Sequence, residues 1–351
     1  MRSLTYAQAI NEALFQAMEY DDRVIFYGLG ATDPKRIFGT TIGLSERFGA
    51  DRVFDTPVSE NAMTGVGIGA ALSGLIPVMC HQRVDFFLLA MEQLINNAAK
   101  WHYMFGSHSP VPVTIRLIVG RGWGQGPTHS QNIHSMFSHV PGLKVVSPST
   151  ARDAKGMLLS AIFDPNPVVF LEHRWLHNQQ GDVPEKPYLI PIGPPRKVSD
   201  GDKVTIVSMS YMTVEAIKAT EYLKKEYKFT TDHFDLRCMK PINYELIYES
   251  VKKTGRLLVL DTGHESGSLA GDVITKVVES CWGSLDTHPV RITIPDIPTP
   301  TSFGLTKHFY PDFQTVIRTI LKMTGMSEKP GSVPPTGEKH DVPGEWFQGP
   351  F

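Results

Sequence analysis

Glu60 and its neighbours are the first candidates for chemistry in this sequence. Glu60 follows a strand-like run at 53–55 and the break Thr56-Pro57, and it opens a stretch of helical composition. Ser59 is expected to cap that helix. A carboxylate at a strand-to-helix turn lies where open α/β sheets place ligand-binding groups. The alternative is that Glu60 only balances the positive end of the helix dipole.

His129 is the second candidate. It lies directly after a glycine-rich loop at 120–126. The imidazole of a histidine exchanges protons near neutral pH, and a loop position lets it reach a substrate. A single histidine can equally be an ordinary packed side chain. His134 and His139 follow at intervals of five, which does not place them on one helical face, so we do not expect a metal cluster.

Alternating strand and helix patterns surround these two residues. Strands are expected at 24–27, 53–55, 75–79, 111–119, 143–146 and 168–172, and helices at 5–19, 44–48, 86–101 and 151–163, with a loop at 28–43. This alternation predicts a mainly parallel sheet. The helix after Glu60 is rich in glycine and alanine, which makes it thin, so another backbone or a ring can approach it closely.

A second, smaller α/β pattern follows a proline-rich crossing at 178–195. Its strands are expected at 204–209, 231–235, 256–261 and 290–294, and its helices at 213–226, 244–254, 268–281 and 312–323. We predict a first domain at 1–185, a linker at 186–198, a second domain at 199–325 and an irregular tail at 326–351. The tail ends in Trp346, Phe347 and Phe351, which either dock on a neighbouring surface or stay solvated.

The composition is that of a globular protein with a sizeable core. The chain has 351 residues, 41% of them hydrophobic and 20% charged, and a formal net charge of −2, so no polybasic signature for nucleic acid or membrane is present. Cys80, Cys238 and Cys281 form no CxxC pair, and we expect buried free thiols in a reducing cytoplasm. The first residues are amphipathic, unlike a signal peptide, and no apolar run reaches the length of a membrane helix.

Several stretches match a known family in order and spacing. They are VFDTPVSE, the small-residue helix after it, EQLINNAAK, GPTHSQ, PGLKVVSPST, AKGMLLSAIFDPNPVVFLEH and FDLRCMKPI. Together they resemble the β subunit of the thiamine-diphosphate-dependent first component of 2-oxo acid dehydrogenase complexes, such as those for pyruvate and branched-chain 2-oxo acids. The resemblance covers about residues 4–325. It implies a transketolase-like pyrimidine-binding domain followed by a transketolase C-terminal domain.

The resemblance also implies roles for individual residues. Glu60 matches the glutamate that activates the cofactor by bonding to its aminopyrimidine ring, which is general acid–base chemistry. Val58 would line the cofactor pocket, and Phe86 matches the aromatic residue that packs on the pyrimidine; ordinary core packing is the alternative for Phe86. His129 matches the active-site histidine. The implied reaction is decarboxylation of a 2-oxo acid and transfer of the remaining acyl or hydroxyalkyl fragment, in the dehydrogenase complexes to a lipoyl-bearing acyltransferase.

The same resemblance implies bound metal ions and a partner subunit. The family holds a potassium ion largely through main-chain carbonyls, at positions that correspond to Val113, Ala161, Asp164 and Asn166. The cofactor's Mg²⁺ is usually held by a Gly-Asp-Gly motif, which this sequence lacks; the nearest candidate, Asp200-Gly201-Asp202, precedes a strand. We therefore expect half of an active site, completed by an α subunit in an α2β2 assembly.

The sequence departs from the family at several points near the expected pocket. These are Gly28-Leu29-Gly30, where an acidic residue is common, Cys80–Val84, and the basic run at 173–177, together with Arg121 in the glycine loop. We expect His81, Arg83 and Arg121 to contact a substrate that is more polar or more anionic than pyruvate, such as a sugar or a phosphorylated 2-oxo compound. The alternative is that these side chains face the partner subunit.

Two other functions remain open at this point. One is a split transketolase or acyloin-forming enzyme, which would pass the fragment to an aldehyde. The other is a non-catalytic scaffolding paralogue, although such a protein would need neither Glu60 nor His129. An unrelated nucleotide-binding protein would need a GxGxxG motif or a P-loop, which the sequence lacks.

Overall fold

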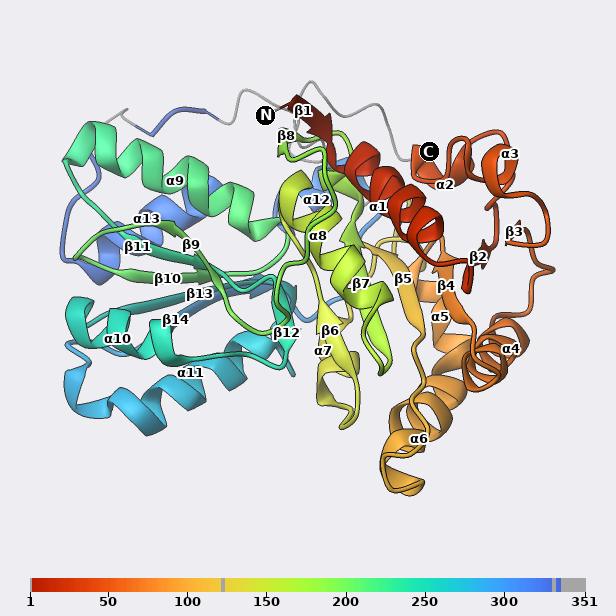
Figure 1. Cartoon of the computed structure of the whole chain (residues 1–351). Helices are drawn as coiled ribbons and strands as arrows, with labels where there is room; N and C mark the ends of the chain where they lie inside the picture. Colours follow the sequence, from red (N-terminus) through yellow and green to blue (C-terminus); the bar gives the residue numbers. More distant parts are fainter. Residues whose placement is uncertain (1, 121–123, 330–332, 336–351) are drawn as a thin grey trace. The chain divides into compact units, whose positions relative to one another are not determined.

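The computed structural model describes residues 2–120, 124–329 and 333–335, and the chain divides into two compact units (Figure 1). Unit 1 contains the described residues up to Ile192 together with Cys238–Pro241, and unit 2 contains the other described residues. The predicted linker at 186–198 spans the boundary between them. Arg121 and the tail aromatics Trp346, Phe347 and Phe351 lie outside the described residues.

Unit 1 is built on a seven-stranded sheet with the order β12-β6-β7-β5-β4-β2-β3. Its strands are β2 (Val24–Gly28), β3 (Val53–Phe54), β4 (Ile76–His81), β5 (Thr114–Val119), β6 (Lys144–Val146), β7 (Val168–His173) and β12 (Cys238–Lys240). All neighbouring strands are parallel except β12, which pairs antiparallel with β6 at the edge. The predicted α/β class with a mainly parallel sheet is confirmed.

Helices flank this sheet, and the first of them starts as the sequence predicts. They are α1 (Tyr6–Tyr20), α2 (Arg36–Gly39), α3 (Leu44–Phe48), α4 (Glu60–Leu72), α7 (His134–His139) and α8 (Ala151–Ile162), with a short turn η3 (Arg174–Leu176). Thr5 and Gln8 form a reciprocal capping box that satisfies free N–H groups at the start of α1. Helices α1 and α8 lie side by side (Figure 1). Ahead of α1, β1 (Arg2–Thr5) pairs antiparallel with β8 (Gln180–Val183), a pairing that the sequence did not predict.

The helix predicted at 86–101 is wrong as a single α-helix. The structure has α5 (Val84–Phe87), a 3₁₀ turn η1 (Leu88–Ala90), a π-helical turn η2 (Gln93–Ala98) and α6 (Ala99–Met104). Within η2, Asn97 Nδ2 donates to Gln93 Oε1 over 3.0 Å. Apolar periodicity does not distinguish these variants, because a turn of π-helix shifts the register by only one residue.

Unit 2 has a five-stranded sheet with the order β14-β13-β10-β11-β9. Its elements are β9 (Arg196–Ser199), β10 (Thr205–Ser208), α9 (Met212–Tyr227), β11 (Asp232–Asp235), α10 (Glu245–Thr254), β13 (Leu257–His264), α11 (Leu269–Cys281), η4 (Trp282–Ser284), β14 (Val290–Ile294), α12 (Phe303–Thr306) and α13 (Phe313–Met323). Strand β9 pairs antiparallel with β11, so part of the predicted linker is a sheet edge.

The described part of the C-terminal segment is irregular but lies against unit 2. Lys329 N donates to Tyr227 Oη over 2.9 Å, and Gln314 Nε2 donates to Pro334 O over 2.7 Å. The three cysteines are free and buried, as predicted. In the ranges that the structure describes, we find no helix with the length and apolar character needed to cross a membrane.

Candidate functional site

Glu60 is the first residue of α4, and its side chain is buried. Only 5% of Glu60 is exposed. Its main-chain oxygen accepts from Thr64 Oγ1 over 2.8 Å, whereas no group in the described part of the chain donates to its carboxylate. Ser59 occupies the N-cap position with an extended φ of −161°, but its side chain makes no capping hydrogen bond, so the predicted side-chain cap is wrong.

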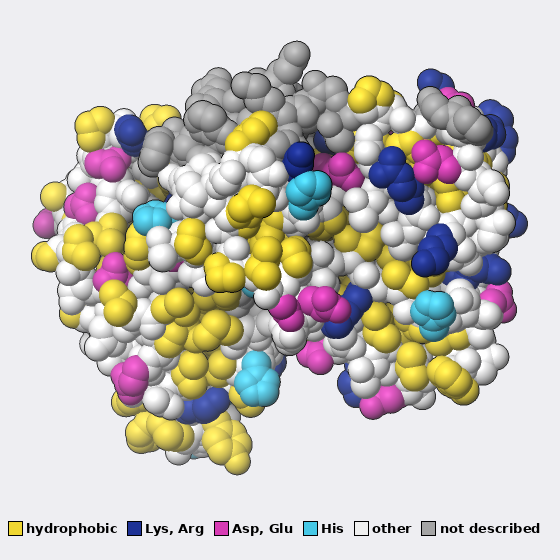
Figure 2. All heavy atoms as spheres, turned by 180° about the vertical axis from the view of Figure 1, so that it is seen from behind, with side chains coloured by type: hydrophobic (Ala, Val, Ile, Leu, Met, Phe, Trp, Pro, Cys, Tyr) yellow, Lys and Arg dark blue, Asp and Glu magenta, His cyan; other side chains and the backbone are white. Residues whose placement is uncertain are grey.

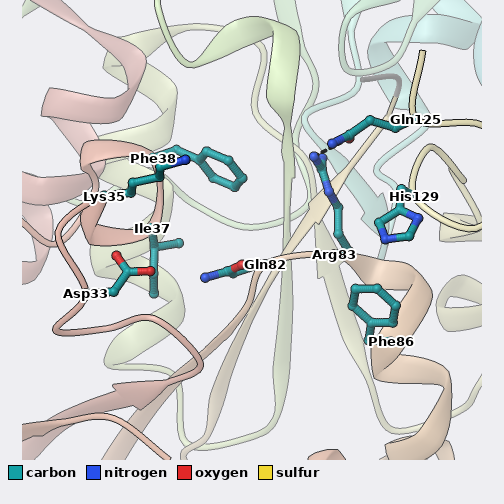
Figure 3. A pocket seen from close by; sticks show the side chains of 9 residues that line it. All are labelled: Asp33, Lys35, Ile37, Phe38, Gln82, Arg83, Phe86, Gln125 and His129. Atoms are coloured by element: carbon teal, nitrogen blue, oxygen red, sulfur yellow. Dashed lines mark hydrogen bonds between the residues drawn. The ribbon is translucent and has the colours of Figure 1, made fainter. Parts of the chain in front are cut away.

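A pocket of about 310 Å³ lies in unit 1 (Figure 3). It is lined by Asp33, Lys35, Ile37, Phe38, Gln82, Arg83, Phe86, Gln125 and His129. Phe86, at the end of α5, meets His129 edge to face, with ring centroids 5.2 Å apart and an interplanar angle of 84°. The structure therefore brings together the two ring residues that the sequence analysis chose for cofactor and substrate. Figure 3 shows them on one side of the pocket, with Asp33, Lys35 and Phe38 opposite.

Glu60 and Val58 are not among the residues that line this pocket. Val58 lies in the turn before α4 and is 80% exposed. It presents an apolar side chain to solvent next to the buried Glu60. Their joint role at a cofactor site therefore stays a prediction.

His81, expected to contact a substrate, lies in the core. It is the last residue of β4, is 1% exposed, and packs edge-on against Phe87 with ring centroids 4.8 Å apart. Among the described residues neither ring nitrogen of His81 has a hydrogen-bond partner. Burial lowers the pKa of His81 to about 3, so the ring is uncharged at neutral pH. The pocket is lined instead by the two residues that follow it, Gln82 and Arg83.

Arg83 lines the pocket, and its predicted contact with a substrate stays a prediction. It is 5% exposed, and its Nη2 donates to Gln125 Oε1. Burial lowers the pKa of Arg83, and the neighbouring Asp85 carboxylate opposes that shift. The Asp85 carboxylate itself accepts from Gln131 Nε2 over 2.7 Å. Arg121, the other predicted arginine, is outside the described residues.

The segment predicted as a plain loop at 28–43 supplies a residue that the sequence analysis missed. Arg36, Ile37 and Phe38 adopt left-handed conformations, with φ of 49°, 47° and 56°. Consecutive non-glycine residues in this region are strained. The turn carries Phe38 into the pocket wall, where the Arg174 guanidinium lies 4.5 Å from its ring centroid. The only sequence signal was the pair Ile37-Phe38 in an otherwise polar loop.

The comparisons with known proteins agree with this architecture. The transketolase pyrimidine-binding domain family matches residues 2–179, and the transketolase C-terminal domain family matches residues 194–316. The chain is 39% identical over 330 residues to the β subunit of an acetoin:2,6-dichlorophenolindophenol oxidoreductase from Cupriavidus necator, covering 92% of this chain and 97% of that one. It belongs to the transketolase-like family of 2-oxo acid dehydrogenase β subunits.

Other members of the family are similar to a comparable degree. The pyruvate dehydrogenase E1 component subunit beta of Rickettsia bellii is 35% identical, covering 91% of this chain and 98% of that one. The 2-oxoisovalerate dehydrogenase subunit beta of Bacillus subtilis is 37% identical, covering 88% and 95%. A solved split-gene transketolase, described as an inactive β4 tetramer, has a TM-score of 0.73 and 20% identity over 93% of this chain and 99% of that one. That likeness shows the fold alone.

The transketolase-like family depends on thiamine diphosphate, and two features of unit 1 fit that cofactor. The Glu60 carboxylate is buried without a donor from the described residues. The Phe86 ring is 39% exposed and borders the pocket, so a face of the ring is available to a flat heterocycle.

The four residues predicted to hold potassium lie around the loop between α8 and β7. Val113 O accepts from Val168 N over 3.0 Å, and Ala161 O accepts from Asp164 N over 3.3 Å. Asn166 Oδ1 is buried and accepts no hydrogen bond from the residues that the structure describes. The Asp164 carboxylate lies 2.5 Å from Lys144 Nζ. The oxygens suit a hard cation, and the Lys144 ammonium balances Asp164.

Proposed function

We propose that this chain is the β subunit of a heteromeric thiamine-diphosphate-dependent enzyme that decarboxylates a 2-oxo acid and transfers the remaining acyl or hydroxyalkyl fragment. The observation that carries the proposal is the position of Glu60, an acidic residue that is only 5% exposed and begins α4. When bound, thiamine diphosphate supplies the electron sink that loss of CO2 from a 2-oxo acid requires. The relatives named above are subunits of enzymes for acetoin, pyruvate and 2-oxoisovalerate.

Residues of this chain would bind and orient the cofactor and would move protons. Glu60 would hold a proton at a ring nitrogen of the aminopyrimidine, Phe86 would pack on that ring, and Val58 would border it. His129 contacts Phe86 edge-on, so its ring nitrogens would reach a substrate held beside the cofactor. General acid–base catalysis of this kind contributes about 10²–10⁴-fold to a rate.

The other half of the site would come from an α subunit. In the described ranges, we find no group of three acidic, histidine or cysteine side chains that could hold a metal ion. At the closest match to a Gly-Asp-Gly motif, the Asp200 carboxylate lies 2.6 Å from Lys197 Nζ, and that of Asp202 lies 3.1 Å from Lys203 Nζ. These ion pairs favour Mg²⁺ being held mainly by the partner, in an α2β2 assembly.

Unit 1 exposes apolar side chains that suit such a partner. On α4 and η1, Val66 and Leu89 are each 68% exposed, and at the end of α6 Tyr103 is 87% exposed. Seen from behind, apolar side chains gather over the tip formed by α6 (Figure 2). Exposed apolar groups of this size mark interaction sites more often than solvated surface. Free thiols suit a reducing compartment, and we place the enzyme in the cytoplasm.

A potassium ion would order the loop between α8 and β7. Its oxygen ligands would come from Val113, Ala161, Asp164 and Asn166, mainly through main-chain carbonyls. The buried Asn166 Oδ1 supports this, because it accepts no hydrogen bond from the described residues. The ion would have a structural role.

A split transketolase or acyloin-forming enzyme is the second candidate. Arg83 and Lys35 in the pocket wall favour it, because cations suit a phosphorylated aldehyde acceptor. The two candidates differ in the acceptor. A dehydrogenase component passes the fragment to a lipoyl-bearing acyltransferase, whereas the alternative releases CO2 and forms product without that protein. A scaffolding paralogue would have no use for the buried Glu60 or for the contact between Phe86 and His129.

Calorimetric titration of Mg²⁺–thiamine diphosphate tests the proposal. The ligand is titrated into this chain alone and then into the chain mixed with its α subunit. We expect no binding to the chain alone and binding to the complex. Tight binding to the chain alone would place the diphosphate site here and contradict the half-site. Absence of binding in both titrations would favour the scaffolding role.

A further inference from the structure

The segments 28–30 and 80–84 lie against each other in unit 1. Strands β2 and β4 are neighbours, with Gly28 opposite Cys80. Beyond the strand ends, Gln82 Nε2 donates to Leu29 O over 3.1 Å. Gly30 has a φ of 78°, and a Cβ there would lie 2.2 Å from Gln82 Nε2. Gly30 therefore leaves room for the side chain of Gln82.

The run at 173–177 also lies near this pocket, because Arg174 contacts Phe38 in the pocket lining. Arg174, in η3, lies with its guanidinium 4.5 Å from the Phe38 ring centroid, and the Arg83 guanidinium lies 5.6 Å from the same ring. Both arginines are buried, at 4% and 5% exposure. Phe38, Arg83 and Lys35 line the pocket, while Arg174 lies outside its lining. Arg83 and Arg174, which are far apart in sequence, thus lie against one aromatic ring at the pocket.

We propose that this wall, formed by Arg83, Phe38 and Lys35 with Arg174 behind it, recognises an additional anionic group on a substrate. The group is a carboxylate or a phosphate, beyond the carboxylate that every 2-oxo acid carries. The inference rests on the proposed function, because it assigns a substrate class to the same pocket. The planar guanidinium of arginine suits both anions through paired hydrogen bonds.

The charges around the wall favour an anion. Two carboxylates face it: Asp33 Oδ1 accepts from Arg36 N over 2.7 Å, and Asp85 Oδ1 accepts from Gln131 Nε2 over 2.7 Å. The nearby His177 is uncharged at neutral pH, because burial lowers its pKa to about 4. Lys35 and Arg83 thus place positive charge in the pocket lining beside Asp33.

The two arginines also act on each other. Burial, together with the positive charge of Arg83, lowers the pKa of Arg174 to about 10. Arg174 stays protonated at neutral pH, so two like charges share one aromatic ring. A bound anion would offset this repulsion. The pocket volume of about 310 Å³ suits a small metabolite.

Matched substrates test the inference in the complete α–β complex with Mg²⁺ and thiamine diphosphate. One pair places the anion on the donor: 2-oxoglutarate against 2-oxopentanoate. The other places it on the acceptor: glyceraldehyde 3-phosphate against glyceraldehyde, with pyruvate as donor. We expect at least a tenfold preference in kcat/KM for the charged member of one pair. The pair that shows it identifies the source of the anion.

Substitutions of Arg83 and Arg174 test whether the wall causes the preference for the charged substrate. Arg83→Gln is expected to abolish it, and Arg83→Lys, which keeps the charge without the planar fork, to restore it in part. Arg174 is a positioning residue, so Arg174→Gln should raise KM for the charged substrate several-fold more than KM for the neutral substrate, and Arg174→Lys should rescue this difference. Arg23→Gln is the matched control, because Arg23 is exposed and pairs with Asp21.

The outcomes separate the inference from the proposed function. Activity on neutral substrates without a charged preference, unchanged by Arg83→Gln, would overturn the inference and leave the proposed function standing. If no 2-oxo acid is decarboxylated, the proposed function fails. Calorimetric titration of inorganic phosphate and of succinate into the complex then decides the inference: binding that is lost in Arg83→Gln supports it, and absence of binding overturns it.

Discussion

Tyr27 occupies the space that a side chain at position 67 would need. A Cβ on Gly67 would lie 2.1 Å from Tyr27 Oη and 2.6 Å from Met79 Cε. The Tyr27 hydroxyl donates to Met63 O over 3.0 Å, near the start of α4. Burial raises the pKa of this hydroxyl well above its usual range, so it remains a donor. The thin helix predicted after Glu60 therefore has a specific cause: it lies directly against a buried tyrosine.

Gly67→Ala is expected to destabilise the chain by about 1–3 kcal/mol, because the new methyl group overpacks a filled site. Gly69→Ala is the matched control in the same helix. A Cβ on Gly69 meets nothing within 4 Å, so helix propensity should make that variant equally stable or up to about 1 kcal/mol more stable. Urea unfolding followed by circular dichroism measures both. Equal stabilities would contradict the packing that we describe.

Local patterns in the sequence were sufficient for much of the fold. The helix predicted at 5–19 begins as expected, with Thr5 at the N-cap of α1. Buried parallel strands such as β5 appear as short apolar runs between turn signals. The interrupted helix at 84–104 and the edge strand β9 could not be predicted, because a π-helical turn and an edge pairing depend on contacts distant in sequence.

In the candidate site, too, some features follow from local sequence and others from contacts between distant residues. Glu60, Phe86 and His129 lie in motifs that can be read from consecutive residues. The contact between Phe38 and Arg174 joins residues far apart in sequence through a left-handed turn, and no periodicity indicates such a turn. His81 was chosen for its type, yet it is the last residue of β4 and its side chain lies in the core. Every residue of β4 is buried, so a side chain at its end is buried whatever its type.

Glu60→Gln is expected to lower kcat of the α–β complex by about 10²–10⁴-fold, because glutamine cannot exchange a proton with a ring nitrogen. The melting temperature should not fall, since the substitution removes a buried acid without a donor among the described residues. Steady-state kinetics and differential scanning fluorimetry measure the two effects.

Glu221→Gln is the control for this substitution, because Glu221 is an exposed acid in α9 and its loss should leave kcat unchanged. Full activity of Glu60→Gln would remove Glu60 from the catalytic site. A drop in activity accompanied by unfolding would instead indicate a structural role at the start of α4.

Two buried histidines make stability depend on pH. Burial lowers the pKa of His81 to about 3, and burial together with the Arg196 charge does the same for His233. Both folded-state pKa values lie below the unfolded value of about 6.5. The stability is therefore fully present above pH 6.5 and is lost as the pH falls toward 3. Each histidine should lower the free energy of unfolding by roughly 1 kcal/mol per pH unit in that range.

His81→Leu tests this dependence, because leucine does not titrate. We expect a shallower fall in melting temperature between pH 6.5 and pH 4.5, and no loss of stability at pH 7.5, where the variant removes ring nitrogens that lack partners among the described residues. The exposed His288 provides the control His288→Gln, which should keep the original pH profile. An unchanged profile in His81→Leu would mean that His81 charges within the fold.

Arg116 and Glu172 form a fully buried ion pair between β5 and β7, with Nε–Oε1 at 2.5 Å and Nη2–Oε2 at 2.9 Å. Burial alone would raise the pKa of Glu172, but the Arg116 charge, the Arg116 hydrogen bonds and the nearby His177, 3.4 Å away, outweigh it and hold this pKa at about 2. Arg116→Met should therefore destabilise the chain by about 3–5 kcal/mol, because it leaves the carboxylate buried and uncompensated.

A second substitution in the same ion pair separates the net contribution of the pair to stability from the cost of leaving one charge buried without its partner. The double variant Arg116→Met with Glu172→Met should recover most of the lost stability, since two apolar side chains of similar volume leave no buried charge. The exposed pair Arg23–Asp21 is the control, and Arg23→Met should cost at most about 1 kcal/mol. Unfolding free energies from urea titration complete the double-mutant cycle. If the double variant is as unstable as the sum of the single variants, the two side chains act independently and the pair does not organise this part of the sheet.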